Sequence, residues 1–179
     1  MKSLLPLLLC FALAPGRPAA PRTTRRKLPP AIRAALDRRY PGWKFPPVRD
    51  EVRKFVKDYF SPAAEPEFTS GDFDGNGERD YAALVEHGTI FDQNGKAVGK
   101  KVRLVAFMKR GGRYRFRLVD PEGGGEYVFA FRKGEKDYDY ETGKNFTYRN
   151  DAIGAGIFEK AGMSYVYERG KFRSIITSD

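Results

Sequence analysis

The sequence has very little cysteine and histidine, with one residue of each, Cys10 and His87. Cys10 lies in an N-terminal stretch that we expect to be removed, so the rest of the chain can form no internal disulfide. A single histidine excludes a zinc site built from several histidines, and no Cys–His pair is available for nucleophilic catalysis. We therefore expect stability to come from packing, assisted by a metal bound through oxygen atoms.

Long hydrophobic runs are also missing. The longest, Leu4 to Ala14, is too short for a membrane-spanning helix, which needs about 20 apolar residues. It follows a basic residue and precedes the small residues of Pro15 to Ala20, an order typical of a secretory signal peptide. We therefore expect residues 1–20 to be a signal peptide, no transmembrane span after its removal, and a periplasmic or secreted protein. A lipid anchor on Cys10 is disfavoured because Leu9 is bulkier than the residue that lipoprotein signals carry there.

The basic residues are unevenly distributed. The formal net charge is +10, which favours acidic partners such as nucleic acid or another anionic polymer. Much of the excess lies near the start of the chain, in Arg17, Arg22, Arg25, Arg26, Lys27, Arg33, Arg38 and Arg39. A flexible basic linker over residues 21–27, followed by a solvated helix, explains this better than a nucleic-acid surface does.

The remaining residues, 28–179, have the length of a single domain. Apolar residues recurring every four positions predict a helix from Leu28 to Tyr40 and a second from Arg49 to Phe60. From Glu67 onward the pattern changes to short alternating runs separated by glycine turns, which predicts antiparallel strands. The expected strands are Glu67–Gly71, Tyr81–His87, Lys101–Lys109, Tyr114–Val119, Glu126–Arg132, Ala152–Phe158, Met163–Glu168 and Lys171–Thr177. We thus predict an α+β fold, with two N-terminal helices packed on one face of an antiparallel β-meander of about eight strands.

The strongest local pattern is the acidic loop of residues 72–80, Asp-Phe-Asp-Gly-Asn-Gly-Glu-Arg-Asp. Side chains with oxygen atoms stand at its first, third, fifth and ninth positions, and the sixth is glycine. The seventh residue, Glu78, can offer its backbone carbonyl. Calcium prefers such an all-oxygen set, and a divalent cation would relieve the repulsion between crowded carboxylates. The pattern therefore predicts a Ca²⁺ site with the ligands Asp72, Asp74, Asn76, Glu78 and Asp80.

This loop resembles the D-x-D-G-N-G-x-x-D calcium segments of FG-GAP and VCBS-type repeats, and less closely the loops of EF-hands and dockerins. The resemblance implies the same five calcium ligands. It departs from an EF-hand at the eighth and twelfth positions, which hold Arg79 and Ala83 instead of an apolar residue and a bidentate glutamate. Because the chain contains one such loop, the multi-bladed propeller of FG-GAP proteins is not implied.

A turn that binds nothing is the alternative explanation of the loop, since aspartate, asparagine and glycine are common turn residues. If the loop does bind calcium, the missing twelfth-position glutamate predicts the weak affinity of extracellular modules, about 0.1–1 mM. Such a site stabilises a loop and does not sense calcium.

A second acidic cluster, Glu135, Asp137, Asp139 and Glu141, alternates with tyrosines. Paired carboxylates can hydrolyse glycosides, although an exposed edge strand or hairpin tip explains the pattern more simply. Three functions thus stay open. A non-enzymatic, calcium-binding module of the bacterial envelope that binds a protein or polysaccharide is favoured. A periplasmic or secreted hydrolase using the residues around Asp137–Glu141, and a cationic binder of anionic polymers, are the alternatives.

Overall fold

The computed structural model describes residues 27–121, 123 and 125–178 of the chain. The predicted signal peptide, residues 1–20, and the predicted basic linker up to residue 26 lie outside the described residues. Two helices, α1 (Pro30–Arg39) and α2 (Asp50–Tyr59), and ten strands make up the described part of the chain. The strands are β1 (Phe68–Gly71), β2 (Asp80–Phe91), β3 (Ala97–Arg110), β4 (Arg113–Asp120), β5 (Tyr127–Phe131), β6 (Lys136–Asp139), β7 (Lys144–Thr147), β8 (Ala152–Ile157), β9 (Ala161–Glu168) and β10 (Lys171–Ser178).

Both helices lie within their predicted ranges. Helix α1 begins at a proline, which suits the first turn of a helix, and buries Ile32 and Leu36, one turn apart. Helix α2 carries two acidic residues in its first turn, where they interact favourably with the helix dipole, and buries Val52 and Val56. Each helix thus presents one apolar stripe to the strands.

The strands form two four-stranded antiparallel sheets and a separate hairpin in the described residues. Sheet A has the order β1-β2-β3-β4, sheet B has the order β10-β9-β8-β5, and β6 pairs with β7. The turn between β3 and β4 is formed by Gly111 and Gly112, with φ angles of 58° and 75°. Two consecutive positive φ values define the two-residue turn that matches the twist of a hairpin, as the Gly-Gly pair predicts.

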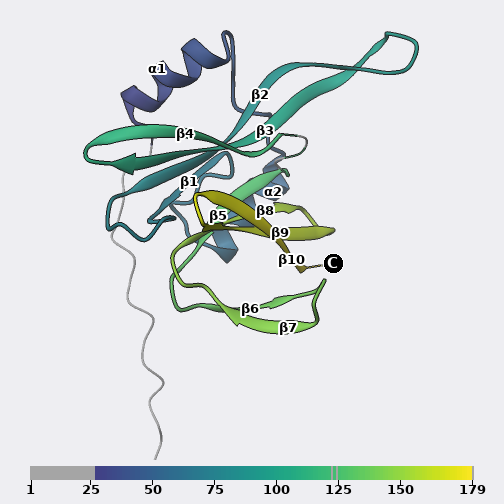
Figure 1. Cartoon of the computed structure of the whole chain (residues 1–179). Coiled ribbons are helices and arrows are strands. Elements are labelled where there is room, and N and C mark those ends of the chain that lie inside the picture. Colours follow the sequence, from purple (N-terminus) through teal and green to yellow (C-terminus); the bar gives the residue numbers. More distant parts are fainter. Residues whose placement is uncertain (1–26, 122, 124, 179) are drawn as a thin grey trace, which may run out of the picture.

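The predicted fold class is wrong. The chain is mainly β, with strands in three antiparallel sheets, and not an α+β fold with two helices on one face of a single eight-stranded meander. After β4 the chain leaves sheet A, and β5 pairs with β8 while the β6–β7 hairpin lies between them in the sequence. Figure 1 shows the hairpin below sheet B and α1 above sheet A.

The physical reason is that the central strands of sheet A are buried on both faces. Ala82, Ala83, Leu84 and Val85 of β2 are each 0% exposed. Ala82 and Leu84 pack in the core between the sheets, together with residues of β5, β8 and β9, whereas Ala83 and Val85 pack against α1. Such strands need a layer on each side, which a single meander with helices on one face cannot provide.

Helix α2 covers sheet B. Val52 and Val56 pack with Tyr127 and Phe129 of β5, whose intervening residue, Val128, points into the core between the sheets. The two helices therefore cover the outer faces of different sheets, and the order of layers is α1, sheet A, sheet B, α2. None of the described helices is long and apolar enough to cross a membrane.

Strands β2 and β3 extend well beyond the rest of sheet A, as the long hairpin in Figure 1 shows. Their pairing continues through Thr89↔Lys100 and Ile90↔Gly99. Strand β1 pairs with β2 only up to Ala83, and β4 pairs with β3 only from Leu104 onward. We call residues 88–101 the distal arm.

Candidate metal centre

The acidic loop connects β1 to β2 at one end of sheet A. Asp72 organises it, because its Oδ1 accepts the N–H of Asn76 at 2.9 Å and its Oδ2 accepts the N–H of Gly77 at 2.8 Å. Phe73, which is 0% exposed, anchors the start of the loop in the core between the sheets. The first residues of the loop thus fix its shape and its attachment to the core.

Asp80 closes the loop as the first residue of β2 and is 0% exposed. Its Oδ2 accepts the N–H of Phe73 at 2.9 Å, and its Oδ1 accepts the N–H of Lys109 in β3 at 2.6 Å. Both oxygens are therefore fixed, one by the loop and one by the neighbouring strand. This explains how a buried carboxylate is tolerated at this position.

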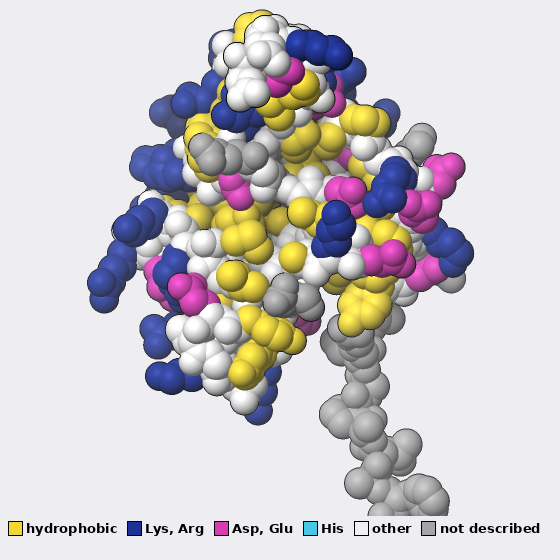
Figure 2. Space-filling model, turned by 90° about the vertical axis from the view of Figure 1, so that its right-hand side faces the viewer, with side chains coloured by type: hydrophobic (Ala, Val, Ile, Leu, Met, Phe, Trp, Pro, Cys, Tyr) yellow, Lys and Arg dark blue, Asp and Glu magenta, His cyan; other side chains and the backbone are white. Residues whose placement is uncertain are grey.

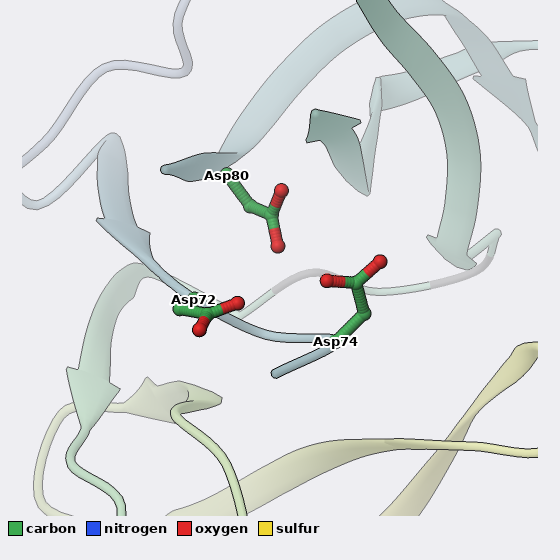
Figure 3. Close-up of side chains that lie close together, drawn as sticks. All are labelled: Asp72, Asp74 and Asp80. Atoms are coloured by element: carbon green, nitrogen blue, oxygen red, sulfur yellow. The ribbon is translucent and has the colours of Figure 1, made fainter. Parts of the chain in front are cut away.

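The carboxylates of Asp72, Asp74 and Asp80 converge. Figure 3 shows them pointing toward a common centre, and each contributes an oxygen atom that lies within 4.8 Å of the other two. Calcium–oxygen bonds are about 2.3–2.6 Å long, so two oxygens that share one ion are separated by up to about 5 Å. The three side chains can therefore hold a metal ion together.

The convergence is electrostatically costly without a cation. Burial, the largest effect, and the charges of Asp74 and Asp72 together raise the pKa of Asp80 to about 6, against the lowering effect of the N–H groups of Lys109 and Phe73. The only counter-charge that the described residues bring to Asp74 is Arg110, whose Nη2 lies 3.6 Å from its Oδ2. A divalent cation at the centre would favour the ionised form of all three carboxylates.

The structure places the side chains of Asn76 and Glu78 differently. The amide of Asn76 accepts the N–H of Glu78 at 2.7 Å and donates to the carbonyl of Lys109 at 2.8 Å. The carboxylate of Glu78 accepts the N–H groups of Gly111 at 2.7 Å and Gly112 at 3.3 Å. These bonds hold the pKa of Glu78 below its usual range. Both side chains connect the loop to the β3–β4 turn, and the carbonyl of Glu78 as a ligand stays a prediction.

Asp151, just before β8, is a further residue of the site that the sequence did not indicate. Its Oδ2 accepts the N–H of Asp72 at 3.1 Å and a bond from Arg132 at 3.0 Å, and its Oδ1 accepts the N–H of Lys133. It thereby ties the loop to sheet B. Beside it lies a pocket of about 310 Å³ whose lining includes Asp72, Arg79 and Arg132.

The second acidic cluster lies on the β6–β7 hairpin, in agreement with the simpler interpretation of its sequence. Asp137 accepts the hydroxyl of Tyr148 at 2.6 Å and the N–H of Tyr138 at 2.8 Å. Asp139 accepts the N–H groups of Glu141 and Thr142 and so shapes the turn. Both carboxylates therefore have structural roles within the hairpin.

Comparisons of the chain with protein families, with curated proteins and with solved structures find no match. The resemblance to FG-GAP and VCBS-type loops therefore stays a prediction from the residues of the loop itself.

Proposed function

We propose that this protein is an exported, non-enzymatic module of the bacterial envelope that binds one Ca²⁺ in the loop 72–80 and acts by binding a protein or polysaccharide partner. The observation that supports the metal is the convergence of three carboxylates, one of them fully buried, on a single point. Export is supported by the apolar N-terminal segment, Leu4 to Ala14.

Calcium fits this site better than a softer metal. The converging side chains offer only carboxylate oxygens, which hard cations prefer, and the nearby amide of Asn76 and carbonyl of Glu78 would add two more oxygens. Outside the cytoplasm, calcium concentrations are high enough to occupy a site with a Kd of about 0.1–1 mM, as in other extracellular calcium modules.

The contacts of the loop support a structural role for the ion. Asp80 bonds to Lys109, Glu78 to Gly111, and Asp72 through its N–H to Asp151, so the loop touches β3, the β3–β4 turn and the start of β8. An ion that orders the loop would therefore stabilise one end of both sheets. The bonds of Asp137 and Asp139 within their own hairpin support a binding role over hydrolysis.

Thermal unfolding with calcium and with chelator tests this proposal. At 1 mM calcium and a Kd of about 0.1 mM, binding stabilises the fold by about 1.4 kcal/mol, which corresponds to an increase in Tm of about 3–6 °C. Asp74→Asn is the sharpest variant. Asp74 accepts one N–H bond and pairs with the exposed Arg110, so an amide that keeps its oxygen toward Asn76 retains the loop bond and loses the weak ion pair together with a ligand charge.

Asp74→Asn is expected to abolish the calcium-dependent increase in Tm while changing the Tm in chelator by little. The matched control is Asp58→Asn, an exposed carboxylate on α2 that pairs with Lys54, and it should respond to calcium as the wild type does. The proposal fails if calorimetry at millimolar calcium detects no binding heat and the wild-type Tm is the same in calcium and chelator.

A further inference from the structure

The distal arm exposes three large apolar side chains. Ile90 is 46% exposed, Phe91 61% and Val98 59%, although they lie in paired strands. Neither edge of this two-stranded ribbon pairs with another strand among the described residues. Isolated two-stranded ribbons are marginally stable in water, so a partner that covers this one would add stability.

Phe91 and Val98 lie near the turn of the arm, where the register of the ribbon shifts. Side chains two residues apart in a strand point the same way, so Phe91 lies on the face of Thr89, and the residue opposite it is Ala97. The register shift leaves Val98 as the extra residue after Ala97. The Nζ of Lys100 donates to the hydroxyl of Thr89 at 3.3 Å, so Lys100 lies on the same face as Phe91. One face of the arm therefore carries Phe91 with a lysine behind it, and Val98 is exposed at the register shift next to Ala97.

The arm is also positively charged. Lys96, Lys100 and Lys101 lie on it against one acid, Asp92, whose Oδ1 accepts the N–H groups of Asn94 and Lys96 and so forms the turn. Figure 2 faces the side toward which the arm projects and shows hydrophobic and Lys or Arg side chains close together near its top. An apolar pair bordered by lysines matches the interface of an anionic bilayer, where acyl chains lie beneath phosphate groups.

We propose that the distal arm docks on anionic phospholipid, with Phe91 and Val98 in the interface and the lysines at the phosphates. The arm lies along the surface on this face, because its turn residues, Asp92 to Lys96, are polar and do not favour insertion of the tip. The stems of Lys96 and Lys100 are long enough to keep their ammonium groups at the headgroups.

The same observations disfavour the other occupants. Two copies of the arm would bring like-charged lysines together, which opposes self-pairing. Nucleic acid and acidic polysaccharides match the lysines but offer no apolar layer for Phe91 and Val98. This inference does not depend on the metal centre, which lies at the other end of β2.

Vesicle co-sedimentation tests the proposal. The chain from residue 21 onward contains every described element and lacks the apolar run Leu4 to Ala14, which would bind lipid by itself. We expect it to bind vesicles of phosphatidylcholine mixed with phosphatidylglycerol, but not vesicles of phosphatidylcholine alone, and to bind equally in calcium and in chelator. The double variant Phe91→Ser/Val98→Ser should weaken binding by about tenfold or more.

The matched control is Tyr140→Ser on the β6–β7 hairpin, which removes an apolar side chain that is 53% exposed and should leave binding unchanged. A thermal melt confirms that each variant is folded. Equal vesicle binding by the double variant and the wild type would overturn the proposal and assign the affinity to the basic N-terminal segment. The proposal would also be overturned if the wild type did not bind vesicles but self-associated or bound duplex DNA. Loss of that binding in the double variant would then assign the arm to another copy of the chain or to nucleic acid.

Discussion

Asp80 shows most clearly how this protein holds charge in its interior. It is fully buried beside two other carboxylates, and each of its oxygens accepts one backbone N–H. An asparagine could satisfy only one of these donors, because its amide nitrogen would face the other. The position therefore requires a carboxylate, because only a carboxylate has two oxygens that accept both N–H groups. The cost of burying its negative charge follows from this requirement.

This charge makes the metal-free protein sensitive to pH. In chelator, a carboxyl NMR titration of Asp80 should give a pKa of about 6. Since the folded pKa exceeds the unfolded value of 3.8, stability from this group is complete below pH 3.8 and is lost as pH rises to about 6, on the order of 3 kcal/mol. Saturating calcium should lower the pKa and remove this loss. An identical titration curve with and without calcium would contradict a metal ion at this carboxylate.

The residues of the candidate site divide by how far apart they lie in the sequence. Asp72, Asp74 and Asp80 fall within nine residues, so their spacing alone suggests that they converge. The groups that hold these carboxylates in place lie far away in the sequence. The N–H of Lys109 and the carboxylate of Asp151 reach the loop through strand register and sheet packing. No local pattern carries that information, so the sequence indicated the acidic residues and missed what holds them in place.

At the scale of elements, the contact between α2 and sheet B depends on the absence of a side chain at Gly154 in β8. A Cβ at Gly154 in β8 would lie 2.3 Å from the ring of Phe129 in β5. That ring cannot retreat freely, because it stacks on Phe60 at the end of α2 with ring centroids 4.0 Å apart. Phe129 therefore fills the space that the missing side chain leaves.

Gly154→Ala is expected to destabilise the protein by about 1–3 kcal/mol, because the added methyl group forces Phe129 into α2. Gly99→Ala in the distal arm is the matched control, since nothing lies within 4 Å of its Cβ position, and it should change stability by less than about 0.5 kcal/mol. Urea unfolding of the two variants measures both. Equal free energies of unfolding for Gly154→Ala and Gly99→Ala would contradict the prediction and show that the ring of Phe129 moves aside without loss of stability.

The elements themselves were predicted better than their arrangement. Helix periodicity and turn glycines are local signals, and both helices and the Gly111-Gly112 turn follow from them. The pairing of β5 with β8 joins strands that are far apart in the sequence. The alternation of apolar and polar residues predicts that each is a strand but not which strand it pairs with. One signal was present: the unbroken apolar run Tyr81 to Val85 is typical of a strand buried on both faces, and it already contradicted a one-sided sheet.

At the scale of the whole molecule, two buried tyrosines donate their hydroxyls to carboxylates. Tyr148, which follows β7, donates to Asp137 within the same hairpin at 2.6 Å, whereas Tyr165 of β9 donates to Asp120 at the end of β4 at 2.7 Å and so connects the two sheets. Burial, strengthened by the carboxylate acceptors, raises the pKa of both phenols far above the usual value of 10.0. Both tyrosines are thus neutral in the folded protein.

This predicts weakness at high pH. Because the folded pKa of each tyrosine is raised, its contribution to stability is complete below pH 10 and falls as the unfolded chain ionises above it. Unfolding followed by circular dichroism should therefore show a steep loss of stability above pH 10. Tyr165→Phe should make that loss shallower, at a cost of about 1 kcal/mol at neutral pH for the missing hydrogen bond. An unchanged slope would show that this tyrosine does not control alkaline unfolding.

The positions of α1 and α2 on opposite outer faces have a consequence for how the polypeptide reaches its native state. The helices come first in the sequence, yet α2 packs on Tyr127 and Phe158, about 70 and 100 residues downstream. During synthesis or translocation α1 must wait for the strands of sheet A, and α2 for β5 and the end of β8, before either helix has a sheet to cover. Assembly must therefore wait for distant segments to meet, and such non-local closure makes refolding slow, on the order of milliseconds to seconds.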